Sequence, residues 1–410
     1  MKFNPFVPNG IAYAGMFTGR GNEISIIEQA LFQTRNENPQ HLLLTGERGI
    51  GKSSLLFYAD LVARGDIESE GVTFNFLSVS TDLAGVTNQV GIIRQIAREL
   101  RSRLREHNAL QEKARKVWDF LSNWEVLCVK YHGREHELDP DELLDELVAL
   151  VGQLVEGGEF DGLVFLLDEA DNPPSSAGLG ELVKIFTERL AKRRLSKVLL
   201  FLAGQSLLVA RLRESHESSL RVFQIVEMRP LELDEREHVV RQGILIANKK
   251  NAVQTSITSG AVELVASLSE GYPHFVQQFS FSAFQADSDN IIDEEDVLSG
   301  AFSENGAISQ LGAKYFSKMY YSKIFSSEYR KVLDYMAKHG DQWVSRKDIV
   351  AECGVASTNI DNALMALKSR EIIIADDARR GFYRLPTRSF ATWILAVSKS
   401  GHDDLFVEGG

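Results

Sequence analysis

Residues 46–54 read GERGIGKSS and lie between an apolar run, HLLLT at 41–45, and a helical pattern over Ser53–Ala63. The segment fits G-x-x-x-x-G-K-[ST], and a strand before it with a helix after it is the setting that this motif requires. Its glycines let the backbone curl so that successive N–H groups point at phosphate oxygens. A chance glycine-rich turn would not explain why strand, loop and helix agree. We therefore expect a P-loop that binds nucleotide phosphates.

Individual side chains of this loop have separate roles. Lys52 places a point charge on the β- and γ-phosphates, and the Ser53 hydroxyl is placed to ligate Mg²⁺. The predicted nucleotide-binding residues of the loop are Gly46, Glu47, Arg48, Gly49, Ile50, Gly51, Lys52, Ser53 and Ser54.

A second segment, LVFLLDEAD at 163–171, is an apolar strand that ends in carboxylates. Carboxylates there lie at the carboxyl edge of a parallel sheet, where the P-loop also lies. We expect Asp168 to hold Mg²⁺ through water and Glu169 to polarise the attacking water. Acidic residues often follow strands, so this segment gains its meaning from the P-loop upstream. Together the two predict a protein that hydrolyses ATP or GTP.

The remaining elements of the first half predict an α/β domain. Short, mostly apolar strands alternate with helices, which is typical of a five-stranded parallel sheet with strands buried on both faces. The predicted strands are 41–45, 72–80, 163–167, 198–203 and 222–226. The predicted helices are 53–63, 90–105, 142–155 and 179–193, with an extra helix inserted between about 110 and 136.

The second half of the chain predicts two smaller domains. After Pro230 the strands stop, and helices are expected over 234–248, 259–269 and 275–286. From Ser326, helices at 328–339, 345–353 and 358–369 are followed by two short strands, EIIIAD and GFYRLP, and a last helix after Pro386. That order is the pattern of a winged helix-turn-helix. We expect a P-loop core over 1–230, a helical lid over 231–310 and a winged helix over 326–400.

Composition limits the compartment and the partners. The 45 basic and 57 acidic side chains give a formal charge of −12, so the whole molecule should repel nucleic acid and anionic membranes. The two cysteines, Cys128 and Cys353, cannot build a disulfide framework, which favours free thiols and a cytoplasmic location. The apolar runs are far shorter than a bilayer span. We expect no membrane segment.

A motif before the P-loop carries a family resemblance. Phe17-Thr18-Gly19-Arg20 with Glu23 is similar to the hydrophobic-Gly-Arg-x-x-Glu box of AAA+ ATPases of the origin-recognition type and of STAND signalling ATPases. The resemblance implies that Phe17, Gly19 and Arg20 lie by the adenine of ATP. An ordinary helix cap is the alternative reading of the Gly-Arg pair alone.

The same resemblance implies further catalytic residues. Gln205, after the fourth strand, takes the place of the polar sensor that contacts the γ-phosphate and the attacking water; a simple helix cap is the alternative. Arg211, Arg213 and Arg221 lie where these families carry an arginine finger, which stabilises charge at the γ-phosphate of a neighbouring subunit. We favour Arg221, although each arginine also fits a solvated basic helix face.

The lid motif separates the two groups within the resemblance. Gly271-Tyr272-Pro273-His274 stands in the place of a second sensor, where origin-recognition ATPases commonly have Arg and many STAND proteins have Gly-x-Pro. The resemblance implies that Pro273 and His274 approach the nucleotide, while a structural histidine is the alternative. The missing arginine favours slow hydrolysis and a switch.

The winged helix is the basic part of an acidic chain. Residues 326–397 carry 11 Lys or Arg and 9 Asp or Glu. Short polar side chains at the start of the third helix could reach base edges, and arginines at the wing tip could meet phosphates. Acidic residues nearby, at 361, 376 and 377, oppose DNA binding, and winged helices also dock proteins. The candidate DNA-binding residues are Ser357, Thr358, Asn359, Asn362, Arg379 and Arg380.

Two functions therefore stay open from the sequence. In the first, ATP and Mg²⁺ drive assembly, as a homo-oligomer or with a partner protein, on double-stranded DNA held by the winged helix. In the second, a STAND-like switch uses its winged helix to dock a protein.

Overall fold

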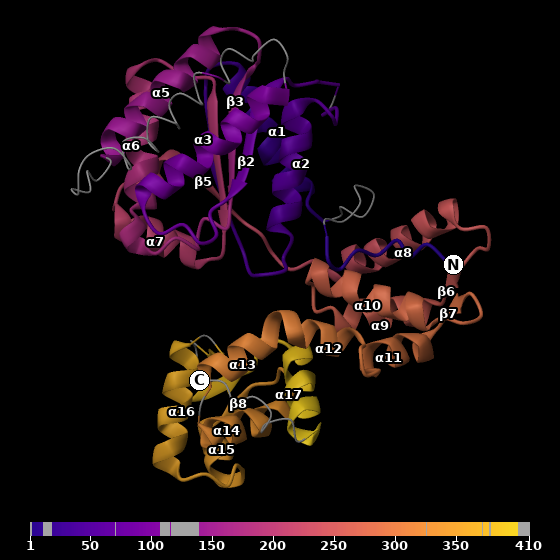
Figure 1. Ribbon diagram of the computed structural model, residues 1–410. Coiled ribbons are helices and arrows are strands. Elements are labelled where there is room, and N and C mark those ends of the chain that lie inside the picture. The colour runs from indigo at the N-terminus through magenta and orange to yellow at the C-terminus, as the bar shows by residue number, and fades with distance from the viewer. Residues whose placement is uncertain are drawn as a thin grey trace, which may run out of the picture. The chain divides into compact units, whose positions relative to one another are not determined.

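The computed structural model (Figure 1) describes residues 2–10, 19–69, 71–106, 115, 139–324, 326–370, 372–376 and 379–400. Its contacts divide the chain into two compact units. The sheet unit is Arg20–Arg229, and the helical unit joins Met1–Gly19 to Pro230–Gly410. Among the described helices, none has both the length and the apolarity needed to cross a bilayer.

The sheet unit contains the predicted five-stranded parallel sheet, in the order β2-β3-β4-β1-β5. Long apolar runs form its central strands because these are buried on both faces. The strands are β1 His41–Thr45, β2 Phe76–Asp82, β3 Gly162–Asp168, β4 Val198–Gly204 and β5 Phe223–Glu227. The predicted extra helix between about 110 and 136 falls outside the described residues, except for position 115.

Two predictions about the edge strands were wrong. β2 begins at Phe76 and not at Val72, because Val72 pairs with Ser69 across a tight turn at Gly71, whose φ is 81°. β5 pairs only with β1 and exposes much of its length, with Ile225 47% exposed. The prediction that every strand is buried on both faces therefore does not hold at this edge.

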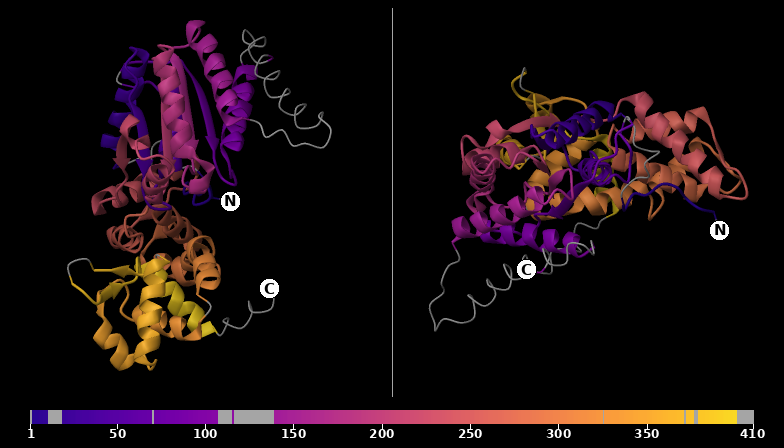
Figure 2. Two further views of the ribbon diagram at one scale, coloured as in Figure 1. Left: turned by 90° about the vertical axis from the view of Figure 1, so that its left-hand side faces the viewer. Right: turned by 90° about the horizontal axis from the view of Figure 1, so that it is seen from above.

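Helices cover both faces of the sheet (Figures 1 and 2). Helices α3, α5 and α6 pack on one face, and α1 and α2 lie against the other. Helix α5 begins where Asp139 caps it, accepting from the backbone N–H of Asp141, with Pro140 in the first turn. The elements are α1 Gly21–Arg35, α2 Lys52–Arg64, α3 Gln89–Glu106, α5 Pro140–Glu156, η3 Ser175–Ala177, α6 Leu179–Lys192, α7 Leu207–Ser215 and η4 Ser219–Val222.

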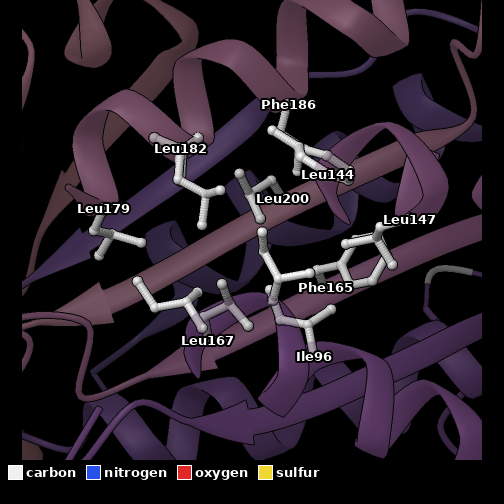
Figure 3. Close-up of a pocket in the computed structure, with 12 residues that line it drawn as sticks. Ile96, Leu144, Leu147, Phe165, Leu167, Leu179, Leu182, Phe186 and Leu200 are labelled. Carbon is white, nitrogen blue, oxygen red and sulfur yellow. The ribbon is translucent and has the colours of Figure 1, made fainter. Parts of the chain in front are cut away.

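A small cavity of about 20 Å³ lies between the sheet and helices α3, α5 and α6 (Figure 3). Its walls are apolar side chains, among them Phe165, Leu200 and Phe186. Water needs several polar partners in such a space, and none of these side chains supplies one. We read this cavity as a packing defect of the core.

The helical unit begins with the lid, whose three predicted helices are present. They are α8 Leu233–Lys250, α9 Ser259–Leu268 and α10 Pro273–Ala286. The prediction that strands stop after Pro230 was wrong, because β6 (Ser256–Ile257) pairs with β7 (Ile291–Ile292). Further helical segments, not predicted, are α11 Glu294–Phe302, α12 Ala307–Leu311, the π-helical η5 Gly312–Phe316 and α13 Ser317–Lys323.

The N-terminal segment packs with the lid. Phe6 is 3% exposed and lies where any side chain on Gly243 of α8 would stand. Gln277 also accepts a hydrogen bond from the Val7 backbone. Residues 2–10 thus add to the lid, although the sequence placed them in the P-loop core.

A winged helix follows the lid. Helices α14 Ser327–Ala337, α15 Arg346–Glu352 and α16 Ser357–Ser369 precede an antiparallel sheet in the order β8-β10-β9, and α17 Arg388–Ser400 ends it. The strands are β8 Val344–Ser345, β9 Ile374–Ala375 and β10 Phe382–Arg384. The sequence did not predict β8, and Ser345 both ends this strand and caps α15 through Asp348.

The lid and the winged helix share one hydrophobic core. Phe316 of the π-helical turn lies 5.0 Å from Phe390 and 5.9 Å from Trp393, ring centre to ring centre, and both of these rings belong to α17. The Glu270 carboxylate, which precedes α10, accepts hydrogen bonds from the Arg388 and Ser389 backbones and from the Ser389 hydroxyl. It therefore caps α17 from the lid.

The buried His41 of β1 generates a prediction about stability. Its Nδ1 accepts the Leu200 N–H at 3.2 Å, and burial lowers the pKa of His41 from 6.5 to about 4. The folded state keeps the ring neutral, so its contribution is complete above about pH 6.5 and is lost as the pH falls toward about 4.

We expect the free energy of unfolding of the sheet unit to fall by about 2 kcal/mol between pH 7 and pH 5 on this account. In His41→Asn, the amide oxygen can accept the same N–H without titrating, so this part of the pH dependence should disappear. Urea titrations at both pH values measure it, and equal pH dependence in the two proteins would contradict the assignment.

Candidate nucleotide site

The P-loop joins β1 to α2 with a backbone that glycine makes possible. Gly49 and Gly51 have φ values of 84° and 101°, and Gly51 is the N-cap residue of α2, in the left-handed conformation. A side chain on Gly46 would stand 3.0 Å from Ile50 and 3.1 Å from Met228. The first N–H groups of α2 have no acceptor within the helix, so the loop fits a phosphate ligand.

Lys52 turns back over this loop. Its ammonium donates to the carbonyl oxygens of Gly46 at 2.8 Å and Glu47 at 2.9 Å. Burial lowers the pKa of Lys52, while the charges of Asp171 and Asp168 act in the opposite direction. Ser53 follows on the exposed first turn of α2. The Lys52 ammonium and the Ser53 hydroxyl thus lie at the junction of the P-loop and α2.

Asp168 and Glu169 lie at the end of β3, as the sequence predicted. The Glu169 N–H donates to Oδ1 of Asp168, and Asn172 donates to Oε2 of Glu169 at 2.6 Å. Glu169 has a φ of 49°, which is uncommon for a residue with a side chain and is typical of strained functional turns. Burial first, and then the charges of Asp168 and Asp82, raise the pKa of Glu169.

Asp82 is a residue that the sequence analysis missed. It ends β2 and pairs in register with Asp168 across the sheet, so a third carboxylate stands beside the acidic pair. The signal was present, because STD at 80–82 ends a strand in polar residues at the same sheet edge. The expected strand at 72–80 stopped short of it.

Gln205 follows β4, which lies between the P-loop strand and the acidic strand. Its backbone N–H donates to Asp171 Oδ1 at 2.9 Å and its side-chain amide donates to Asp171 Oδ2 at 3.0 Å. Its carbonyl also accepts the Leu208 N–H at 2.8 Å at the start of α7, so Gln205 joins the acidic loop after β3 to that helix. Asp171 is a further residue that the sequence analysis did not single out.

Arg20 is buried, with 5% of its surface exposed. Its guanidinium donates to the carbonyls of Ile50 at 3.0 Å and Arg229 at 2.7 Å and pairs with Glu23. It therefore ties the P-loop to the segment after β5.

The comparisons with known proteins agree with this geometry. Residues 16–196 match the family profile described as the AAA ATPase domain. The search of curated proteins found no match.

Solved structures extend the fold comparison. The ORC2 protein of Aeropyrum pernix, in its ADPNP–ADP complexes, is similar over 93% of each chain at 14% identity, with a TM-score of 0.54. Its ADP form aligns with 96% of this chain and 95% of that chain at 15% identity, with a TM-score of 0.51. The fold of this chain is thus similar to that of these ORC2 structures over nearly the whole length of each chain.

The three arginine-finger candidates, Arg211, Arg213 and Arg221, differ in their surroundings. The Arg211 guanidinium donates to the carbonyls of Asp171, Asn172 and Pro173, so it supports the acidic loop of its own chain. Arg213 and Arg221 are exposed, and neither guanidinium bonds to any residue that the structure describes. The arginine finger stays a prediction, and Arg213 and Arg221 are the two candidates whose side chains are exposed.

Four other predicted nucleotide-site residues lie outside the described part of the sheet unit. Phe17 lies outside the described residues. Gly19, with a φ of 70°, and Pro273 and His274 belong to the helical unit. Pro273 begins α10, and the His274 ring lies 5.0 Å from the Tyr315 ring, centre to centre.

The exposed face of α16 differs from its prediction in one residue. Ser357, Thr358 and Asn362 are exposed, but the Asn359 side chain donates to Glu328 of α14 at 2.8 Å. The prediction that Asn359 reads bases is therefore not supported by its position. Asn359 is the third residue of α16, and its side chain lies on the side of the helix that faces α14.

Arg346 changes the charge balance of that face. It forms a bidentate pair with Asp361, at 2.6 and 2.8 Å, and donates to the Ser357 hydroxyl. Since Arg346 lowers the pKa of Asp361, this carboxylate stays charged but paired. Its repulsion of phosphate is thereby reduced.

The two wing arginines have different surroundings. Arg379 pairs with Asp376 at 2.6 Å, and its guanidinium lies 4.7 Å from the Phe382 ring centre. Arg380 is exposed, and its guanidinium bonds to none of the residues that the structure describes. Both arginines are exposed, but the Arg379 guanidinium is held by Asp376 and lies near the Phe382 ring.

The acidic cluster yields a prediction about Glu169. Because burial, Asp168 and Asp82 all raise its pKa, we expect Glu169 to titrate above the usual value of 4.5. Asp82→Asn removes one of those charges and should lower the pKa of Glu169, whereas Asp145→Asn on the distant α5 surface should not. NMR titration of ¹³C-labelled glutamate, assigned with Glu169→Gln, measures both. An unmoved titration in Asp82→Asn would contradict this account.

Proposed function

We propose that this protein binds ATP with Mg²⁺ and hydrolyses it slowly, and that the nucleotide state controls assembly and the binding of duplex DNA by the winged helix. The observation that carries the proposal is one sheet edge that holds the P-loop, the Asp168–Glu169 pair and Gln205. The similar A. pernix ORC2 structure contains ADPNP and ADP, which supports a nucleotide in this fold.

Each of these residues has a chemical task. Lys52 binds the β- and γ-phosphates, and its ammonium then gives up its hydrogen bonds to the carbonyls of Gly46 and Glu47. Ser53 and Asp168 would hold Mg²⁺, which neutralises charge on the phosphates, and their hydroxyl and carboxylate oxygens suit this hard cation. Glu169 takes a proton from the attacking water, which a raised pKa favours. Arg221, exposed on η4, is the arginine that we assign to a neighbouring subunit's phosphates.

The nucleotide proposal predicts distinct losses in two variants. Lys52→Ala should lose ATP affinity by on the order of 10²-fold or more, because the charge on the phosphates is removed. Glu169→Gln should keep that affinity and lose hydrolysis by on the order of 10²-fold or more.

Fluorescent ATP-analogue binding and phosphate release measure these effects. Lys184→Ala and Glu188→Gln, which change an ion pair on the surface of α6, are the matched controls. Unchanged affinity in Lys52→Ala removes the P-loop argument, and wild-type turnover in Glu169→Gln assigns the general base elsewhere.

DNA binding rests on the exposed polar residues of α16 and on the wing. Thr358 and Asn362 share the exposed face of α16, while Arg380 extends from the wing. The paired Asp361 and Arg346 leave little net charge between them. A helix face that reads bases and a wing that contacts phosphates are the parts that a duplex requires.

A second candidate function has its own observation. Met365, in the middle of the exposed face of α16, is 70% exposed. An apolar side chain there suits a protein partner better than a phosphate backbone. In this reading the protein is a STAND-like switch whose winged helix docks a protein. The free thiol of Cys353 fits the reducing cytoplasm in either case.

The wing separates the two functions. If the duplex is the partner, Arg380→Ala should reduce the slope of log K against log salt by about one unit. Arg379→Ala, the matched control, removes an arginine already paired with Asp376 and should reduce that slope less.

Full-length protein with ATP and a labelled duplex, at several salt concentrations, provides the measurement. Equal slopes for Arg380→Ala and wild type contradict a role of the wing in DNA binding. No duplex binding by either protein favours the docking function.

A further inference from the structure

The loop after β3 contains a further carboxylate, Asp171, which is more deeply buried than Asp168 and Glu169. Asp171 is 7% exposed, and both of its oxygens accept from one residue, Gln205. Oδ1 accepts the backbone N–H at 2.9 Å, and Oδ2 accepts the side-chain amide at 3.0 Å. The backbone and the side chain of Gln205 are therefore fixed by the same group.

The residues around Asp171 allow its carboxylate to lie this close to Gln205. A side chain on Gly204 would stand 2.6 Å from Asp171 Oδ1 and 3.0 Å from the Asp171 backbone nitrogen, so only glycine leaves room for the carboxylate. The Ala170 N–H donates to Ala203 at 2.9 Å, which joins the loop to β4. Arg211 holds the carbonyls of residues 171–173 from the other side.

The chemistry of the pair decides how the amide of Gln205 is oriented. Both oxygens of Asp171 accept hydrogen bonds from Gln205, so the amide of Gln205 presents its NH₂ group to Asp171. The amide oxygen is then turned away from Asp171. Gln205 lies at the carboxyl end of β4, between the P-loop strand and the acidic strand, so its amide stands at the sheet edge that carries the P-loop.

We propose that Asp171 is a positioning residue, which fixes the Gln205 amide so that its oxygen accepts a hydrogen bond from the attacking water. This inference rests on the proposed ATP hydrolysis. The water oxygen forms a bond to the γ-phosphorus, and the bond from that phosphorus to the bridging oxygen breaks, its electron pair going to ADP. One water proton passes to Glu169, and the other O–H bond points at Gln205.

Four variants test the orientation of the amide. Asp171→Asn lets the Gln205 amide turn over, and we expect kcat to fall by about tenfold or more with the Kd for ATP unchanged. Gln205→Ala should show a similar loss. Gln205→Glu places a carboxylate against Asp171, so it should also lose turnover. The double variant Asp171→Asn/Gln205→Glu lets the new amide donate to the new carboxylate, which again turns an oxygen toward the water.

The double variant therefore separates an acceptor from a donor at position 205. If the oxygen of Gln205 orients water, the double variant should turn over several-fold faster than either of its single variants. If Gln205 instead donates to the γ-phosphate, the double variant has no donor and stays as slow as they are, which overturns the proposal. Wild-type kcat in Asp171→Asn overturns it as well.

The fold is monitored in parallel. Thermal unfolding and ATP binding of each variant show whether a lost kcat comes from misfolding, and Gln205→Asn, which leaves the carboxylate of Asp171 in place, is a milder second variant that should also lose kcat. ATP binding without hydrolysis by the wild type would contradict the proposed function. Hydrolysis by the wild type that Asp171→Asn leaves unchanged would contradict this inference alone.

Discussion

The position of β4 between β1 and β3 is the constraint on which the nucleotide site depends. Backbone pairing fixes it, with Leu44 opposite Ala203 and Leu166 opposite Phe201. Since all of these strands are parallel, their carboxyl ends meet at one edge. The P-loop, the acidic loop and Gln205 come from distant parts of the sequence and are brought together by this order. The apolar helices on both faces keep the strands in place.

Much of the fold could be predicted because its signals are local. An unbroken apolar run such as VLLFLA reports burial on both faces, and the P-loop motif includes its own strand and helix. Caps and periodicity indicated the lid helices in the same way. The two-residue strands β6, β7 and β8 could not be predicted, because so short a strand is defined only by its partner. β5 reads as a core strand, yet its place at the edge leaves it exposed.

The candidate site shows the same division. Lys52, Ser53, Asp168 and Glu169 could be identified from motifs, since each motif fixes its residues by spacing. The roles of Asp171 and Arg211 depend on hydrogen bonds between the β3 and β4 loops, and no spacing rule relates those loops. Asn359 illustrates the converse. Its residue type and its position in the helix suggested that it contacts DNA. The hydrogen bond to Glu328 of α14 depends on how the two helices pack, which the sequence does not show.

The shared core of the lid and the winged helix bears on how such a protein could be re-engineered or could diverge. Phe316 of η5 packs against Phe390 and Trp393 of α17, so side chains of both parts fill one core. Gly312 leaves the space that Trp393 fills. A winged helix taken from another protein would not fit here unless the lid helices were redesigned with it, because matching apolar surfaces are needed on both sides. The two parts behave as one exchangeable module, and a new binding specificity must come from changes on the exposed face of α16 and on the wing.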